Sequence, residues 1–318
     1  MDSTVNNGVQ LQESDRAGVI TIIDNYTDVL LDSTETVQRP PRAAGGHIAD
    51  APVAEHGFSI LIKVFKDSET HTILLDTGLS KIGVPYNLKV FGIDLGEVEA
   101  VVISHGHMDH FGTLENILAA RKGITVVLHP AAIAASRGAR FRDGTIYEFP
   151  TLNEKALTEA GAKLVKSKDP YLMANGLIAT TGEVERVTDF EKGSPSLWVE
   201  RNGEILEDQV IDDQGVMINV AGKGLVVISG CAHAGIINMI RHAQRVTKID
   251  KVYAVVGGFH LPSPYFQPIV DRTIQELKAI GPEIVVPMHC TGWDATTRIA
   301  QEMPSQFVLS SVGTTFVF

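Results

Sequence analysis

The sequence predicts one compact domain of the α/β class. Strand-like and helix-like segments alternate in two blocks, at about residues 18–135 and 210–318. No segment between the blocks has the composition of a flexible tether. Residues 136–212 are less regular, with clustered arginines, several aromatic residues and many turn residues. We therefore expect a single domain over residues 1–318, with a long insertion at about 136–212.

Short runs rich in β-branched residues predict the strands of the first block. They lie at residues 19–24, 58–65, 72–75, 98–103 and 124–128. The polar, Pro/Gly-rich segment 32–55 predicts a loop. Helical segments are expected at residues 79–92, 113–121 and near 131.

The second block opens with a predicted hairpin. Residues 216–220 and 225–229 are two β-branched runs joined by the turn-forming segment 221–224. Further strands are expected at residues 251–256, 283–287 and 307–310. Helices are expected at residues 235–246, 268–280 and near 295.

Composition and charge exclude several classes of protein. The 27 Lys and Arg stand against 38 Asp and Glu, and a net charge of −11 argues against a nucleic-acid binder, which needs a basic face. Two cysteines, Cys231 and Cys290, are too few for a disulfide scaffold. The polar N-terminus has no signal-peptide pattern, and no run of 18 apolar residues is present. We therefore expect a cytoplasmic protein without membrane contact.

Histidines gather in one short segment. His105, His107 and His110 fall within six residues, with Asp109 among them. Imidazole and carboxylate are ligands of zinc, iron and manganese, and the segment follows a buried strand, where α/β proteins place functional loops. Four such side chains exceed what one ion normally takes from so short a segment. The segment therefore predicts two ions sharing the loop, or one ion with additional catalytic groups.

The pattern His-x-His-x-Asp-His at 105–110 resembles the signature of the metallo-β-lactamase fold superfamily. The segment Leu-Leu-Asp-Thr-Gly at 74–78 resembles that superfamily's first motif, and the resemblance extends over about residues 17–318. It implies a four-layer αββα sandwich with a metal site at the sheet edges. It also implies metal ligands within the motif, namely His105 and His107 for a first ion, and Asp109 and His110 for a second.

Three later motifs each place a histidine just after a predicted strand, as a site built from sheet-edge loops would. They are S-G-C-A-H-A-G at 229–235, G-G-F-H-L at 257–261 and P-M-H-C-T-G at 287–292. Together they are similar to the branch that includes the archaeal 7,8-dihydropterin-6-methyl-4-(β-D-ribofuranosyl)aminobenzene 5′-phosphate synthases. That branch also holds bacterial hydrolases of unassigned substrate.

The chain departs from the commoner superfamily pattern at two places. Residues 212–215 read Asp-Asp-Gln-Gly and lack the histidine of the usual Gly-His motif. Gly230-Cys231 stands where a Gly-Asp with a metal-bridging carboxylate is usual. His233 is the natural substitute ligand for the first ion. Cys231 is either a thiolate ligand, since a nearby cation lowers a thiol pKa, or a small buried hydrophobe, so the number of ions stays open.

Three further residues complete the candidate site. His289 is expected as the last ligand of the second ion, with a core or substrate-binding histidine as the alternative. His260 is expected near the ions as a substrate contact or proton donor, or else as a cap of the turn before it. Asp76 is expected to hold a ligand histidine through its second ring nitrogen, or to be a plain turn residue. The other histidines are expected on the surface or in the core: His47, His56, His71, His129 and His242.

Arginines cluster in the insertion. Arg137, Arg140 and Arg142 lie within six residues, beside Phe141 and Tyr147. Guanidinium forks suit phosphate or carboxylate. The cluster therefore predicts a pocket wall for an anionic substrate, or a solvated loop paired with the excess acid.

These observations support a primary hypothesis and its alternatives. Two divalent ions, zinc first and manganese or iron as alternatives, would share a water and lower its pKa. We expect a metal-dependent hydrolase, binuclear, acting on a small ester, lactone or phosphoester, with Asp109 and His260 as catalytic groups. The resemblance adds a synthase or lyase on a phosphorylated pterin-like substrate, and iron would suit redox chemistry or sensing. The expected partner is a small-molecule substrate, and the oligomeric state stays open.

Overall fold

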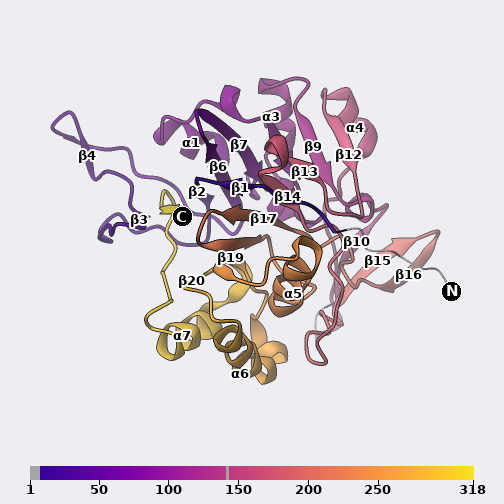
Figure 1. Cartoon of the computed structure of the whole chain (residues 1–318). Helices are drawn as coiled ribbons and strands as arrows, with labels where there is room; N and C mark the ends of the chain where they lie inside the picture. The colour runs from indigo at the N-terminus through magenta and orange to yellow at the C-terminus, as the bar shows by residue number, and fades with distance from the viewer. Residues whose placement is uncertain (1–7, 141–142) are drawn as a thin grey trace.

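The computed structural model describes residues 8–140 and 143–318 and contains two large β-sheets packed face to face (Figure 1). The first sheet has eight strands in the order β12-β9-β8-β7-β6-β2-β21-β3. In chain order these are Arg16–Ile23 (β2), Val37–Gln38 (β3), Ser59–Lys66 (β6), Glu69–Leu75 (β7), Ala100–Val102 (β8), Thr125–Leu128 (β9), Lys163–Lys166 (β12) and Thr315–Val317 (β21). The helices of this half are Gly83–Val90 (α1), Met108–Phe111 (α2), Leu114–Ala120 (α3) and Glu154–Glu159 (α4).

The second sheet has the order β13-β14-β17-β18-β19-β20, and β1 pairs with β17 beside this path. Its strands are Glu13–Ser14 (β1), Leu172–Met173 (β13), Ile178–Thr180 (β14), Gly215–Val220 (β17), Gly224–Ser229 (β18), Val252–Gly258 (β19) and Ile284–Met288 (β20). Its helices are Ile236–Thr247 (α5), Ser263–Ile280 (α6) and Trp293–Glu302 (α7). β17 and β18 form the predicted hairpin.

Alternating side chains produce four layers. In β6, Ile60 and Ile62 belong to the core between the sheets, whereas Leu61 packs among the buried residues of α1 and α3. In β17, Ile218 faces the same central core and Met217 faces the core under α5 to α7. This follows from the two-residue period of a strand. The four-layer αββα arrangement implied by the resemblance is therefore confirmed.

Two parts of the chain differ from the sequence prediction. The final strand is β21, not 307–310, where the structure has an isolated bridge from Phe307 to Val285. The stretch 136–212 is divided between sheets, because β12 joins the first large sheet and β13 and β14 join the second. Its remaining strands form a separate sheet that extends away from the body in Figure 1: Arg137–Arg140 (β10), Ile146–Glu148 (β11), Leu197–Arg201 (β15) and Glu204–Glu207 (β16). Strands of two to five residues are too short to show a period in the sequence.

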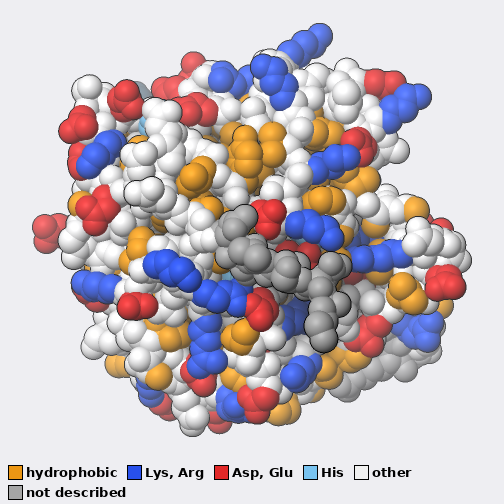
Figure 2. Space-filling model, turned by 45° about the vertical axis from the view of Figure 1, so that its right-hand side comes forward, with side chains coloured by type: hydrophobic (Ala, Val, Ile, Leu, Met, Phe, Trp, Pro, Cys, Tyr) orange, Lys and Arg blue, Asp and Glu red, His pale blue; other side chains and the backbone are white. Residues whose placement is uncertain are grey.

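The segment 32–55 contains β3 and a small hairpin, Ala43–Ala44 (β4) with His47–Ile48 (β5), and is otherwise irregular. None of the helices in the described part of the chain is long and apolar enough to cross a membrane. On the face drawn in Figure 2, Lys and Arg side chains are interspersed with Asp and Glu.

Candidate metal centre

Five loops at one edge of the two large sheets carry the candidate residues. Parallel strands β7 and β8 end side by side in the first sheet, as do β18, β19 and β20 in the second. Each loop begins directly after its strand, and the loops carry Asp76 after β7, residues 104–110 after β8, Cys231 and His233 after β18, His260 after β19 and His289 after β20. Residues far apart in the sequence therefore converge.

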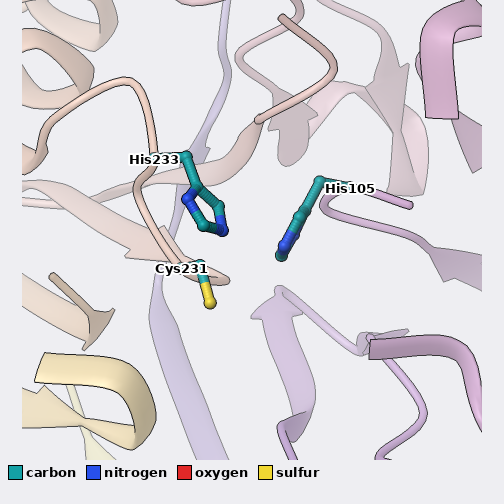
Figure 3. Close-up of side chains that lie close together, drawn as sticks. All are labelled: His105, Cys231 and His233. Atoms are coloured by element: carbon teal, nitrogen blue, oxygen red, sulfur yellow. The ribbon is translucent and has the colours of Figure 1, made fainter. Parts of the chain in front are cut away.

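The first side of the centre holds His105, His107 and His233. Figure 3 shows the imidazoles of His105 and His233 facing one another, with the sulfur of Cys231 beside the gap. One ligand atom from each of His105, Cys231 and His233 lies within 4.8 Å of the other two. His107 Nδ1 lies 3.0 Å from His105 Nε2, so all three predicted ligands of the first ion meet here.

The second side holds Asp109, His110 and His289. Ligand atoms of His110, His289 and Cys231 lie within 4.8 Å of one another, and His110 Nε2 is 3.1 Å from Cys231 Sγ. Asp109 Oδ2 lies 3.2 Å from His289 Nε2 and 3.8 Å from His110 Nε2. Cys231 is thus common to both sides.

Asp76 orients the His110 ring on the second side. Its Oδ2 accepts hydrogen bonds from His110 Nδ1 at 2.7 Å and from Ser104 Oγ at 2.6 Å, and its Oδ1 accepts from the Ser104 backbone N–H at 2.7 Å. The group is buried. Gly230 allows this contact between loops, since a Cβ there would lie 2.1 Å from Ser104 Oγ.

A buried ion pair holds the backbone of the first side. Asp212 Oδ2 accepts the Gly106 N–H at 2.7 Å, and the two Asp212 oxygens pair with Arg137 at 3.1 and 3.2 Å. Arg137 is fully buried and also lies 3.3 Å from Asp208. This role of Asp212 was not predicted from the sequence.

The next two residues tie the loops after β8 and β18 together. Asp213 Oδ2 accepts the Ala234 N–H at 2.9 Å. Gln214 donates from its backbone to Ser104 O and from its side chain to Ile103 O, each at 3.0 Å. The segment 212–214, noted in the sequence for lacking a histidine, therefore forms a clamp between two ligand loops. Its signal was two acidic residues directly before a buried strand.

Residues at the end of β2 position His289. Asp24 Oδ1 accepts the His289 N–H at 2.9 Å, and the Asn25 side chain donates to His289 O at 2.9 Å. Burial raises the pKa of Asp24, although the hydrogen bonds that it accepts from the backbone N–H groups of Asn25 and His289 act against the shift. Neither residue was predicted from the sequence, because only the packing of β2 beside this loop brings them near.

His56 and His260 lie at the margin of the centre. His56 Nε2 is 3.7 Å from Asp109 Oδ2, and its ring is 5.1 Å from that of His289, although its side chain is 66% exposed. No neighbouring motif in the sequence indicated that His56 would lie here. The His260 ring lies 4.0 Å from the His233 ring. Both His233 and His260 line a cavity of about 190 Å³ whose aromatic walls are Phe190, Phe259, Tyr265 and Phe266.

The first-side histidines are neutral without a cation. Burial is the largest cause that lowers their pKa values, which fall to about 3 for His107 and well below the ordinary range for His105 and His233. Neutral imidazole is the form that binds metal ions. This side can therefore accept an ion without first losing protons from these rings.

The second side is charged. Burial lowers the pKa of His110, but the carboxylates of Asp76 and Asp109 outweigh it and raise the pKa to about 9. Burial raises the pKa of Asp109, but His110 and His289 outweigh it and hold the pKa far below its usual range. An ion bound here would replace the His110 proton.

The comparisons with known proteins agree with this geometry. The sequence model described as the metallo-beta-lactamase superfamily matches residues 53–194. The chain is 33% identical over 261 residues to a 7,8-dihydropterin-6-methyl-4-(beta-D-ribofuranosyl)-aminobenzene-5′-phosphate synthase of Methanocaldococcus jannaschii, covering 80% of this chain and 87% of that protein. The chain belongs to the metallo-β-lactamase superfamily.

Two further relatives support the assignment. An uncharacterized protein of Methanocaldococcus jannaschii is 31% identical over 267 residues, covering 82% of this chain and 92% of that protein. A crystal structure of a metal-dependent hydrolase of the β-lactamase superfamily superposes with a TM-score of 0.72 at 25% identity, covering 94% of this chain and 98% of that chain. The αββα layers are thus those of the metallo-β-lactamase fold.

The residues of the candidate site suit a divalent ion, because several of their ring nitrogens have no hydrogen-bond partner in the part of the chain that the structure describes. Both ring nitrogens of His233 and Nδ1 of His289 are buried and form no hydrogen bond among the described residues, whereas His289 Nε2 faces Asp109 Oδ2 at 3.2 Å. Buried polar atoms are rarely left in this state, because it costs free energy that a ligand recovers. His233 would complete the first side and His289 the second.

The remaining predicted residues lie elsewhere. Arg137 is buried against Asp212 and Asp208 rather than solvated, Arg140 is exposed on β10, and Arg142 lies outside the described residues. His242 is a core histidine whose Nε2 lies 3.0 Å from Thr181 O. The other histidines lie outside the centre: His47 and His71 pair with no ligand residue, and His129 contacts Glu183.

Proposed function

We propose that this chain is a binuclear metal-dependent hydrolase of a small ester, lactone or phosphoester. The observation that carries the proposal is the pair of imidazole sets facing one another across Cys231, with unpaired nitrogens on His233 and His289. Zinc is the first expected ion because imidazole, carboxylate and thiolate are its ligands. His105, His107 and His233 would hold one ion, and Asp109, His110 and His289 the other.

Asp109, His260 and Asp76 would each have a separate role in the reaction. When bound, two divalent ions lower the pKa of a water and polarise the bond to be cleaved. Asp109 keeps its negative charge beside His289 and orients the water. His260, next to the cavity, is placed to donate a proton to the leaving group. Asp76 fixes the ring orientation of His110 through its 2.7 Å hydrogen bond.

Metal analysis of the wild type and His107→Ala is the first test. We expect about two equivalents of zinc or manganese in the wild type and a sharp fall in the variant, because His107 is a ligand of the first side. His47→Ala, which removes an exposed histidine from β5, is the matched control and should keep both ions. A wild type that takes up no ion after reconstitution would contradict the proposal.

Substrate tests follow on the metal-loaded protein. A panel of esters, lactones and phosphoesters should give turnover that chelation abolishes and metal restores. His260→Gln should lower kcat more than it raises KM, because proton donation acts in the transition state. Bound iron without hydrolysis of any panel member would instead favour redox chemistry.

A second candidate is a synthase or lyase acting on a phosphorylated pterin-like substrate. It is favoured by the 33% identity to the synthase of Methanocaldococcus jannaschii and by the aromatic cavity next to His233, which suits a flat ring. Arg137 gives it no support, since its guanidinium is already paired with Asp212 and Asp208. The test is mass-spectrometric detection of the product named for that relative, after incubation with a phosphorylated pterin-like substrate.

A further inference from the structure

The two cysteines lie together beside His260. The sulfurs of Cys231 and Cys290 and a ring nitrogen of His260 all lie within 4.8 Å of one another. Both cysteines are buried and free of disulfides, and Cys290 Sγ donates to Cys231 O at 3.5 Å. Cys231 follows β18, His260 follows β19 and Cys290 follows β20, all in the second sheet. This is a third group of ligand atoms, and it shares only Cys231 with the two histidine sides.

The surrounding backbone makes room for this group. A Cβ on Gly258 would lie 2.7 Å from Cys290 Sγ, so a larger residue there would push the thiol away. His260 has a φ of 41°, in the left-handed region that is unfavourable for a non-glycine residue. The Phe259 N–H donates to Thr291 Oγ1 at 3.0 Å, which fixes the loop of His260 to the loop of Cys290.

One polar atom of the group is left without a partner. His260 Nδ1 is buried and forms no hydrogen bond among the described residues. A buried polar atom in this state costs free energy that a bound ligand recovers, and one nitrogen of this ring lies within 4.8 Å of both sulfurs.

We propose that Cys231, Cys290 and His260 form a binding site for a thiophilic metal ion, with Zn²⁺ as the natural divalent case. Two thiolates and one imidazole are soft ligands that favour zinc over hard ions such as Mg²⁺ or Ca²⁺. On binding, each thiol gives its proton to solvent as its sulfur forms a bond to the ion, so two protons are released per ion and no electrons are transferred.

The site shares Cys231 with the centre of the proposed hydrolase and uses one ring nitrogen of His260, the proposed proton donor, but metal binding here does not depend on hydrolysis. A thiolate sulfur can contact more than one ion, so Cys231 can serve this group and a histidine side together. The site therefore predicts a second sulfur–metal bond from Cys290, which the histidine sides do not require.

The probe is Cd²⁺, whose bond to thiolate absorbs in the ultraviolet. The reduced, chelator-stripped full chain is titrated with Cd²⁺, and the absorbance at saturation is compared between the wild type and Cys290→Ser. The variant should show about half of the wild-type absorbance, because one of two thiolates is gone. Full wild-type absorbance and stoichiometry in Cys290→Ser would overturn the proposal.

A second variant keeps the test decisive if Cys290→Ser does not fold. His260→Gln leaves both cysteines in place and should weaken the Cd²⁺ affinity read from the sulfur band by about 10-fold or more, as loss of a ligand requires. His47→Gln, which changes an exposed histidine on β5 away from the centre, is the matched control and should leave that affinity unchanged. Wild-type affinity in His260→Gln would contradict the site. A normal sulfur band without hydrolysis would leave this site intact and count against the proposed hydrolase alone.

Discussion

The two sides of the candidate metal centre are built from different chemistry. The first side consists of three buried imidazoles, His105, His107 and His233, that burial keeps neutral. The second side combines Asp109 with His110, whose pKa the neighbouring carboxylates raise to about 9. The first side is held from outside, through backbone N–H groups at Gly106 and Ala234. The second is held partly through a ring, by Asp76 on His110, and partly through the backbone N–H of His289, by Asp24.

This difference shows where each side is vulnerable. A change behind the first side alters the path of two loops and therefore the fold around it. A change behind the second side alters the orientation and proton affinity of one imidazole. We therefore expect mutation of Asp212, behind the first side, to act mainly on stability, and mutation of Asp76, behind the second, to act mainly on metal affinity.

The largest expected effect is from Asp212→Asn. The variant leaves the fully buried Arg137 guanidinium with Asp208 as its remaining carboxylate. Breaking a buried ion pair from one side costs about 3–5 kcal/mol, so the free energy of unfolding should fall by that order in denaturant titrations of the metal-free protein. Asp271→Asn, which removes an exposed partner of Arg298, is the control and should cost far less. Equal losses of unfolding free energy in Asp212→Asn and Asp271→Asn would show that the ion pair behind the first side does not stabilise the fold more than an exposed one.

The next effect is the pH dependence contributed by Glu191. Its carboxylate accepts the N–H groups of Ile237 and Asn238, at the start of the helix that follows the His233 loop. Burial nevertheless raises the pKa of Glu191 to about 7, from 4.5 in the unfolded chain. Between these values the folded state binds more protons, so this group makes stability fall as pH rises.

The expected loss from Glu191 is about 3 kcal/mol between pH 4.5 and 7. Glu191→Gln cannot ionise and should flatten this part of the stability profile, whatever it does to the absolute stability. Denaturant titrations of wild type and variant across this pH range measure the difference. Parallel profiles would show that Glu191 keeps an ordinary pKa in the folded protein.

The smallest expected effect is from Asp76→Asn, which tests the second side. Asn tolerates the φ of 59° at this position, so the backbone should persist. Loss of the carboxylate behind His110 should weaken one of two Zn²⁺ affinities by about 10- to 100-fold, measured by competition with a chelator. The other affinity should stay within error. An equal loss at both ions would mean that Asp76 supports the whole centre rather than its second side.

The sequence predicted much of this architecture from local signals. The segment 105–110 concentrates ligand-type side chains after a buried strand, and the structure places all four of them in the centre. The motifs at 229–235, 257–261 and 287–292 follow β18, β19 and β20 as expected. Most strand positions could be predicted because buried runs of Val and Ile are long enough to show a strand pattern. The three-residue strand β21 is too short to show one.

The supports of the centre were not predictable in the same way. Arg137 and Asp212 are 75 residues apart, and Asp24 and His289 are 265 residues apart, so no sequence window contains both partners. The arginine cluster suggested an anionic substrate or a solvated loop. The sequence alone does not show whether an arginine is buried or exposed. His56 likewise has no neighbouring motif, yet it lies 3.7 Å from Asp109.

The sequence by itself determined which side chains can bind a metal ion and that they follow strands, because ligand chemistry belongs to single residues and strand patterns are local. Only the tertiary structure decided which ligands share a side, that Cys231 lies between both sides and beside Cys290, and which carboxylates hold them in place. The physical reason is that convergence depends on how two sheets pack. That packing is set by the whole core rather than by any segment of the chain.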